Sequence, residues 1–158
     1  MMRMRLRLFG LVGLACLTAC SSGPVRRVSE PAVSIQQLTV HANGSWSIDL
    51  RLQNYSSIPM RFETASLALS LDGQAAGTVS ATPAVSVGPE SADVVSVPFQ
   101  PDSQGRMVLA DVLAAQRSLP YELKGTLSAT PEEGKLREFK IEGKNTLSPV
   151  PGLPGVLR

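Results

Sequence analysis

Side chains alternate between apolar and polar from Trp46 to Leu52, and this alternation limits the choice of fold more than any other feature of the sequence. The even positions are apolar, whereas Ser47, Asp49 and Arg51 fill the odd ones. A period of two places successive side chains on opposite faces of a strand. The preceding Asn43-Gly44 favours the positive φ of a tight hairpin turn. We therefore expect a strand with one buried face, paired antiparallel with the segment 34–41.

The same alternation recurs along the chain. Apolar residues alternate with polar ones in the segments 65–71, 95–99, 121–127 and 139–141, and a further short strand is expected at 75–81. A change of parity between Phe62 and Ala65 predicts a β-bulge near Glu63-Thr64. Asp72-Gly73 predicts a second hairpin, and Pro98 is typical of an edge strand or a strand end.

One segment has helical spacing instead. In Met107–Gln116, apolar residues recur at intervals of three and four, which predicts a short amphipathic helix with Asp102 or Ser103 near its start. Six or seven short strands with one short helix predict an all-β fold, an antiparallel β-sandwich.

The N-terminus has the organisation of a secretion signal. Three arginines precede an apolar run at residues 8–17, which is too short to span a bilayer that requires about 20 helical residues. Leu17, Thr18, Ala19 and Cys20 follow. This pattern resembles the lipobox of bacterial lipoproteins, in which the three residues before the cut are recognised by signal peptidase II and the cysteine thiol is lipidated.

We therefore expect a lipoprotein signal peptide at 1–19, a flexible tether at 20–33, a folded domain at 34–148 and an extended, poorly ordered Pro/Gly-rich tail at 149–158. The alternatives are an ordinary secretory signal cut near Ala19, or an uncleaved anchor. Cys16 is a rival lipid site, but Gly13 stands where a lipobox favours Leu. Ser21, rather than Asp, after Cys20 favours the outer membrane over the inner.

Removal of the signal changes the charge and the thiol content. Three of the 15 basic residues lie in residues 1–19, so 12 remain against 13 acidic ones. The mature chain thus lacks the concentrated basic face of a nucleic-acid-binding protein. It also keeps no free thiol for a disulfide or a thiolate metal site. Arg26-Arg27 in the tether could contact anionic headgroups, or could simply be solvated.

Residues with catalytic or ligand-binding chemistry are few. His41 stands alone beside a predicted turn, which favours an exposed residue over a metal ligand or general base. Trp46 is in phase with Ile48 and Leu50, which favours core packing over a ligand platform. A hydrolase would need two carboxylates that converge in a cleft. The candidates on the predicted polar faces are Asp49, Glu63, Asp93, Glu122, Glu138 and Glu142. We predict no cofactor and no metal.

The most specific segment is Leu50-Arg51-Leu52-Gln53-Asn54-Tyr55-Ser56-Ser57-Ile58-Pro59. It resembles a segment of the late embryogenesis abundant type 2 family, also called the water-hypersensitivity (WHy) domain. In that family a strand ends in Asn, usually followed by Pro, and an Ile-Pro or Leu-Pro pair comes shortly after. Asn54, Ile58 and Pro59 match the pattern, and Tyr55 departs from it. The Asn side chain can close the turn, and Pro59 fixes φ before the next strand.

Further segments agree in order. Leu67–Gly73 with Gly77, Ser91–Phe99, and the run Tyr121-Glu122-Leu123-Lys124-Gly125-Thr126-Leu127 are similar to later strands of the family, as are Phe139 and Gly143. The resemblance implies an Ig-like or fibronectin-like sandwich without enzyme activity, in which the motif residues, Tyr121 and Gly125 included, are structural.

The sequence leaves three candidate functions for this protein. The first is a non-catalytic lipoprotein, held on the periplasmic side of an envelope membrane by the lipid on Cys20, that protects against desiccation or osmotic stress as the resemblance implies. The second is an interaction or assembly module that binds a periplasmic protein through a free sheet edge. The third is a hydrolase.

Overall fold

The computed structural model describes residue 23 and residues 25–158, and its regular elements are nine strands and one helix. In chain order they are β1 (Ala32–Val40), β2 (Trp46–Gln53), β3 (Met60–Leu71), β4 (Gln74–Ala81), β5 (Val85–Val87), β6 (Ala92–Phe99), α1 (Ser103–Ala115), β7 (Leu119–Pro131), β8 (Arg137–Leu147) and β9 (Val156–Leu157). The predicted all-β class with one short helix is confirmed.

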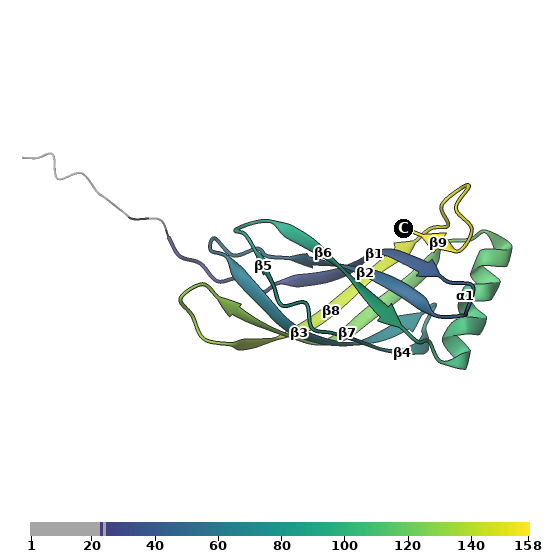
Figure 1. The fold of residues 1–158 in the computed structure, drawn as a ribbon, viewed down its shortest axis with the longest axis horizontal. Coiled ribbons are helices and arrows are strands. Elements are labelled where there is room, and N and C mark those ends of the chain that lie inside the picture. The colour runs from purple at the N-terminus through teal and green to yellow at the C-terminus, as the bar shows by residue number, and fades with distance from the viewer. Residues whose placement is uncertain (1–22, 24) are drawn as a thin grey trace, which may run out of the picture.

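Two antiparallel sheets face each other (Figure 1). One has the strand order β6-β2-β1-β9, and the other has the order β4-β3-β7-β8 with β5 paired to one end of β3. The predicted hairpin between β1 and β2 is present, with a loop at 41–45 in which Gly44 has φ of 81°. The predicted bulge appears as a register shift between Phe62 and Thr64 where β3 pairs with β7. β6 lies at a sheet edge, as Pro98 predicts.

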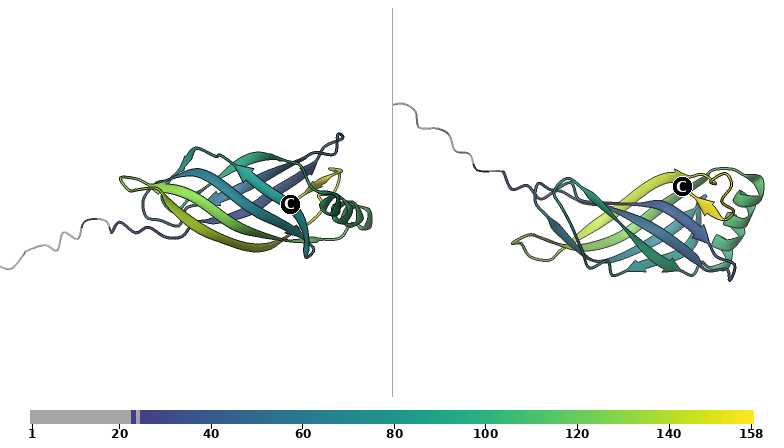
Figure 2. Two further views of the ribbon diagram at one scale, coloured as in Figure 1. Left: turned by 90° about the horizontal axis from the view of Figure 1, so that it is seen from below. Right: turned by 45° about the horizontal axis from the view of Figure 1, so that its top comes forward.

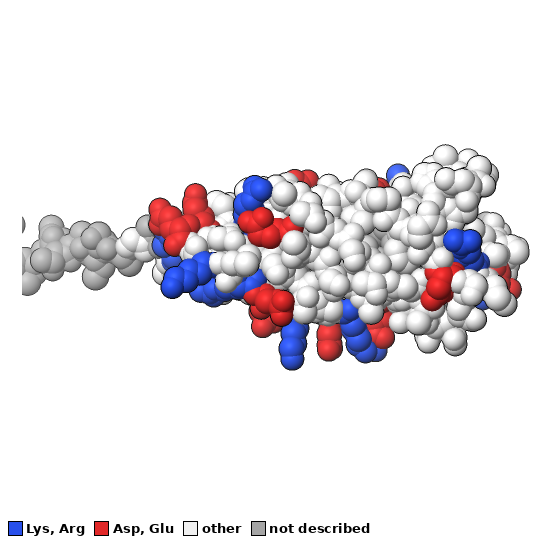
Figure 3. All heavy atoms as spheres, turned by 60° about the horizontal axis from the view of Figure 1, so that its bottom comes forward, with Lys and Arg blue, Asp and Glu red and all other residues white. Residues whose placement is uncertain are grey.

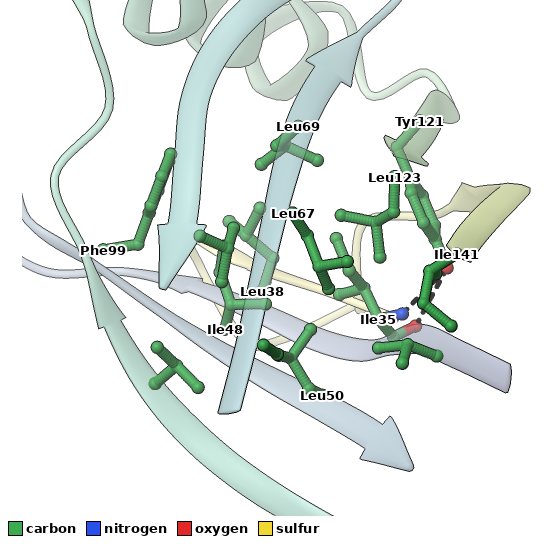
Figure 4. Packing of buried hydrophobic residues seen from close by; sticks show 14 of the residues in the cluster. Ile35, Leu38, Ile48, Leu50, Leu67, Leu69, Phe99, Tyr121, Leu123 and Ile141 are labelled. Atoms are coloured by element: carbon green, nitrogen blue, oxygen red, sulfur yellow. Dashed lines mark hydrogen bonds between the residues drawn. The ribbon is translucent and has the colours of Figure 1, made fainter. Parts of the chain in front are cut away.

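The apolar parity of each strand forms the core between the sheets (Figure 4). Ile48, Leu50 and Leu52 of β2 are fully buried. Ile48 and Leu50 lie on the side of β2 that faces Leu67 and Leu69 of β3. Full burial of one such side chain contributes roughly 1.5–3 kcal/mol to the free energy of folding. Because no disulfide occurs among the described residues, the stability of the domain depends on this core.

The helix α1 lies across one end of the sandwich, far from the end at which the described chain begins (Figures 1 and 2). Its N-cap is Asp102, whose carboxylate accepts a hydrogen bond from the Gly105 N–H at 2.8 Å. Gly105 itself lies against Ala76 of β4, and a side-chain Cβ there would stand 2.7 Å from the Ala76 Cβ. The predicted helix is confirmed, and its glycine allows the close approach to β4.

The C-terminal segment differs from our expectation of a poorly ordered tail. Val156 and Leu157 form β9, which pairs with Leu38 and Thr39 of β1, and Leu157 is fully buried. The turn before β9 uses Gly152 and Gly155, both with positive φ. The proline-rich composition was misleading because it does not show that an apolar residue beyond it completes a sheet.

The expected flexible tether also differs in its second half. β1 already begins at Ala32, and Pro31 is buried. Residues 25–29 are hydrogen-bonded to the loop between β2 and β3. The folded unit therefore begins near Val25 rather than at residue 34.

Candidate functional site

The predicted lipid site, Cys20, and the residues Leu17, Thr18 and Ala19 before it lie outside the described residues. Their assignment therefore stays a prediction from sequence. Within residues 25–158, α1 is neither long enough nor apolar enough to cross a bilayer.

Asn54 is the centre of a buried hydrogen-bond network at the end of β2. Its side-chain amide donates to the carbonyl oxygens of Ile58, Val87 and Gly88 at 2.9, 3.1 and 2.9 Å, and its Oδ1 accepts from the Ser56 N–H at 2.8 Å. The side chain thus closes its own turn, as the motif predicts, and also joins that turn to the end of β5. Asn54 and Ser56 are the two fully buried polar residues of the described chain.

Ser56 joins the same network to the N-terminal segment. Its hydroxyl accepts a hydrogen bond from the Ser29 N–H at 2.9 Å. Together, the segment 25–29, the β2–β3 loop 54–59, the β5–β6 loop 88–91 and the β7–β8 turn 132–136 form what we call the tether end. Acidic and basic side chains are interspersed there (Figure 3). This end is the candidate functional region, because the described chain enters the fold here.

The other motif residues support the fold. Pro59 directly precedes β3, and its carbonyl accepts from the Glu132 N–H at 2.9 Å. At Gly125 a Cβ would overlap the Ser66 carbonyl oxygen of the neighbouring β3, so only glycine fits between these strands. Ile58 contributes one of the three carbonyls to which the Asn54 amide donates.

Tyr121 links the two sheets. Its hydroxyl, buried in the core, accepts from the Ile35 N–H at 2.9 Å and lies 3.5 Å from the Ile35 carbonyl oxygen (Figure 4). The contact satisfies backbone groups of β1 beside the irregular register between Ile35 and Gln37. Burial raises the pKa of the Tyr121 phenol, and the backbone hydrogen bond opposes this in part.

His41 and Trp46 take the structural positions that the sequence favours. His41 is exposed, and its Nε2 lies 2.7 Å from the Ser47 hydroxyl. Trp46 is buried and packs against Phe99 of β6, with ring centroids 5.7 Å apart. Among the described residues, no three His, Cys, Asp or Glu side chains come together in a way that could hold a metal ion.

None of the six candidate carboxylates is buried; Asp93 has the inward parity of β6 but is exposed at the start of that strand. Glu122 lies 2.8 Å from Lys124 and 3.4 Å from Lys144, and Lys124 lowers the pKa of the Glu122 carboxyl. An open hollow of about 410 Å³ between β1 and β8 is lined by Glu30 and Glu142, among others. Both are exposed, whereas a general acid requires a carboxyl shielded from water. The exposed position of Glu30 and Glu142 favours solvated surface charges over an acid/base pair of a hydrolase.

Sequence reasoning missed how the tether-end residues work together. Ser29 and Ser56 carry no pattern that predicts their contact, because they lie in different segments. The pair Arg26-Arg27 is evident in the sequence, but its partners Glu133 and Glu90 lie in distant loops and are not predictable from local sequence.

The profile of a family described as late embryogenesis abundant protein matches residues 49–143. No curated protein matches the chain. The chain is similar to a protein from Arabidopsis thaliana solved in solution, at 13% identity and a TM-score of 0.47, over 81% of this chain and 84% of that one. It is also similar to a protein from Archaeoglobus fulgidus, at 12% identity and a TM-score of 0.41, over 78% of this chain and 100% of that one.

Proposed function

This chain belongs to the late embryogenesis abundant protein family, and from that premise we propose that it is a non-catalytic, lipid-anchored protein of the cell envelope that protects the cell during drying or osmotic stress. The family match carries the proposal. The match runs from within β2 into β8, so it covers most of the β4-β3-β7-β8 sheet and, in the other sheet, β6 and part of β2. Its motif residues, such as Asn54 and Gly125, serve the fold, which leaves the function to the surface and to the location of the protein.

The location follows from the lipobox-like sequence. Cys20 comes directly after Leu17, Thr18 and Ala19, at the end of an apolar run of signal-peptide length. Diacylglycerol on the thiol would hold the domain on the periplasmic side of a membrane, because two buried acyl chains make release slow. The outer membrane is favoured by Ser21. In this proposal the water-stress role is exerted beside a bilayer.

The experiment is a deletion strain tested for survival after drying and after hyperosmotic shock. We expect lower survival than in the parent, restored by the wild-type gene. A Cys20→Ala gene that makes the protein at the same level should restore less, because the domain would no longer be held at the membrane. Deletion cells that survive both stresses as well as the parent would contradict the protective role.

The second candidate function is a periplasmic assembly module. It is favoured by the edge strand β6, whose pairing among the described strands is with β2 alone. Unpaired backbone groups along such an edge can accept a strand from another protein. Crosslinking in intact cells distinguishes the two, since an assembly module gives one stoichiometric partner and a protectant does not.

A further inference from the structure

Within the tether end, the N-terminal segment Val25–Ser29 is hydrogen-bonded through its backbone to the β2–β3 loop. The Arg27 N–H donates to the Ser57 hydroxyl at 2.7 Å, and the Ser57 N–H donates back to the Arg27 carbonyl at 3.0 Å. The Ser57 hydroxyl also donates to the Val25 carbonyl at 2.8 Å. These bonds set the point at which the chain leaves the fold.

The two arginines of this segment bind loops on different sides of it. Arg26 contacts the β7–β8 turn, with 2.8 Å to the Glu133 carboxylate and 3.0 Å to the Glu132 carbonyl. Arg27 contacts the Tyr55 carbonyl at 3.1 Å and the Glu90 carboxylate at 3.3 Å. Because each guanidinium is paired with a carboxylate, the two arginines add to the backbone bonds of the segment and offer little uncompensated positive charge to anionic lipid.

Apolar side chains are exposed on the same loops. Val25 is 79% exposed, Tyr55 52% and Leu136 63%. They belong to the N-terminal segment, the β2–β3 loop and the β7–β8 turn, which the two arginines connect. Exposed Lys135 and Arg137 flank Leu136. Apolar and aromatic tips with adjacent basic residues are typical of side chains at the interface between a bilayer and water.

The chain between the anchor and the fold is short. Val25 follows Cys20 by five residues. A fully extended chain spans at most about 3.6 Å per residue, so Val25 lies within about 18 Å of the lipidated cysteine. That length brings the tether end to the headgroups and leaves the helix α1 at the opposite end of the long axis (Figure 1).

We propose that the tether end docks on the lipid bilayer, with Val25, Tyr55 and Leu136 at headgroup depth and the α1 end directed away from the membrane. The inference rests on the proposed lipid anchor at Cys20. We choose the bilayer as the binding partner because the short chain to the anchor keeps these loops close to it. A protein bound to the same loops is an alternative outcome of the test.

The test uses the full chain, expressed with its signal and reconstituted into vesicles of phosphatidylethanolamine and phosphatidylglycerol. Single cysteines replace Tyr55, Leu136 or, as the control at the α1 end, the 49%-exposed Leu153. Each carries a bimane label, and brominated lipids quench it. We expect at least threefold stronger quenching at positions 55 and 136 than at 153. Equal quenching at all three positions, or labels at 55 and 136 covered by a co-purified protein, would overturn the docking.

Mass spectrometry of the same preparations separates the two proposals. A chain without acyl mass on Cys20 contradicts the anchor itself. A lipidated chain whose labels at 55 and 136 are not quenched contradicts only the docking.

A second variant tests the role of the arginines. Arg26→Ala together with Arg27→Ala should loosen the segment by removing its contacts with Glu133 and Glu90, although its backbone bonds to Ser57 remain. We expect quenching at 55 and 136 to fall at least twofold, while the fluorescence of the buried Trp46 is unchanged. The matched control is Arg117→Ala, because Arg117 alone pairs with as many carboxylates as Arg26 and Arg27 do together, Asp111 at 2.6 Å and Asp72 at 3.7 Å. Unchanged quenching in the double variant would contradict the arginine contribution.

Discussion

At the scale of single residues, buried polar groups determine how the segments meet. Asn54 brings three carbonyl groups and one N–H into one network, and Tyr121 supplies a hydroxyl to β1 from the opposite sheet. Buried backbone groups that lose such partners are costly, since water cannot replace them. Loss of either side chain should therefore destabilise the fold by more than the loss of its buried area alone would.

Asn54→Ala should lower the free energy of unfolding by at least about 3 kcal/mol, because three carbonyls and the Ser56 N–H lose a buried partner at about 1–3 kcal/mol for each unsatisfied group. Urea denaturation measures the loss. Asn145→Ala is the control, since Asn145 is exposed, and it should change stability by less than about 0.5 kcal/mol. Equal effects of the two variants would contradict the network.

Tyr121→Phe should lower the free energy of unfolding by about 1–3 kcal/mol at neutral pH, because the Ile35 N–H loses its acceptor. Burial raises the pKa of the folded phenol above the unfolded value of about 10. The phenol's contribution is therefore fully present below pH 10 and is lost as the pH rises toward the folded pKa.

Urea denaturation of both proteins between pH 7 and pH 11 tests this. The stability gap between wild type and Tyr121→Phe should narrow above about pH 10, where the unfolded phenol ionises. A gap that is constant with pH would show that burial of the hydroxyl does not control its ionisation.

At the scale of elements, close approach and strand pairing decide the architecture. β3 and β7 pair along eleven positions, and Gly125 lies where the β3 backbone leaves no room for a Cβ. The short strand β9 extends the other sheet by pairing with β1. Both features join elements that are far apart in the sequence.

Gly125→Ala should destabilise the fold by about 3 kcal/mol or more, because the added methyl overlaps the Ser66 carbonyl and forces β3 and β7 apart. Thermal unfolding followed by circular dichroism measures the change. Gly23→Ala is the control, since nothing lies within 4 Å of its Cβ position. A stable Gly125→Ala protein would refute the close approach.

Leu157→Ala should cost about 2–5 kcal/mol, as expected for a fully buried leucine. Leu153→Ala in the preceding loop is half-exposed and should cost less than about 0.5 kcal/mol. Denaturant midpoints of the two variants decide whether β9 belongs to the folded unit, and identical midpoints would mean that it does not.

At the scale of the whole molecule, the two ends of the sandwich differ. The tether end carries interspersed charges and exposed apolar tips, and the opposite end is covered by α1 (Figures 1 and 3). The described chain enters at the first of these ends. Attachment at Cys20 would therefore act on one end of an elongated domain.

Cys20→Ala should leave the domain folded and move it from the membrane fraction to the soluble fraction of the periplasm. Each buried methylene of an acyl chain contributes about 0.8 kcal/mol to membrane binding, and the variant loses all of them. Fractionation followed by immunoblotting measures the shift, and melting of the purified variant checks the fold. A variant that stays with the membrane would refute the lipid anchor.

The sequence alone determined the elements that depend on neighbouring residues. Alternation predicted β2 and its buried face, and the parity change near Glu63 predicted the bulge. The helix is expected to start near Asp102 or Ser103, and the structure has Asp102 as its N-cap. The turn closed by Asn54 was also predictable, since the side chain bonds to residues two and four positions on.

Only the tertiary structure decided the strand order, the pairing of β9 with β1, and the contacts of Arg26 and Arg27. Ile35 and Tyr121 are 86 residues apart, and Arg26 and Glu133 are 107 apart. No local pattern records such pairs, because they form when two sheets bury their apolar faces together. The local alternation predicts which face of each strand is buried. Which strands and loops become neighbours is determined only when those faces pack against each other.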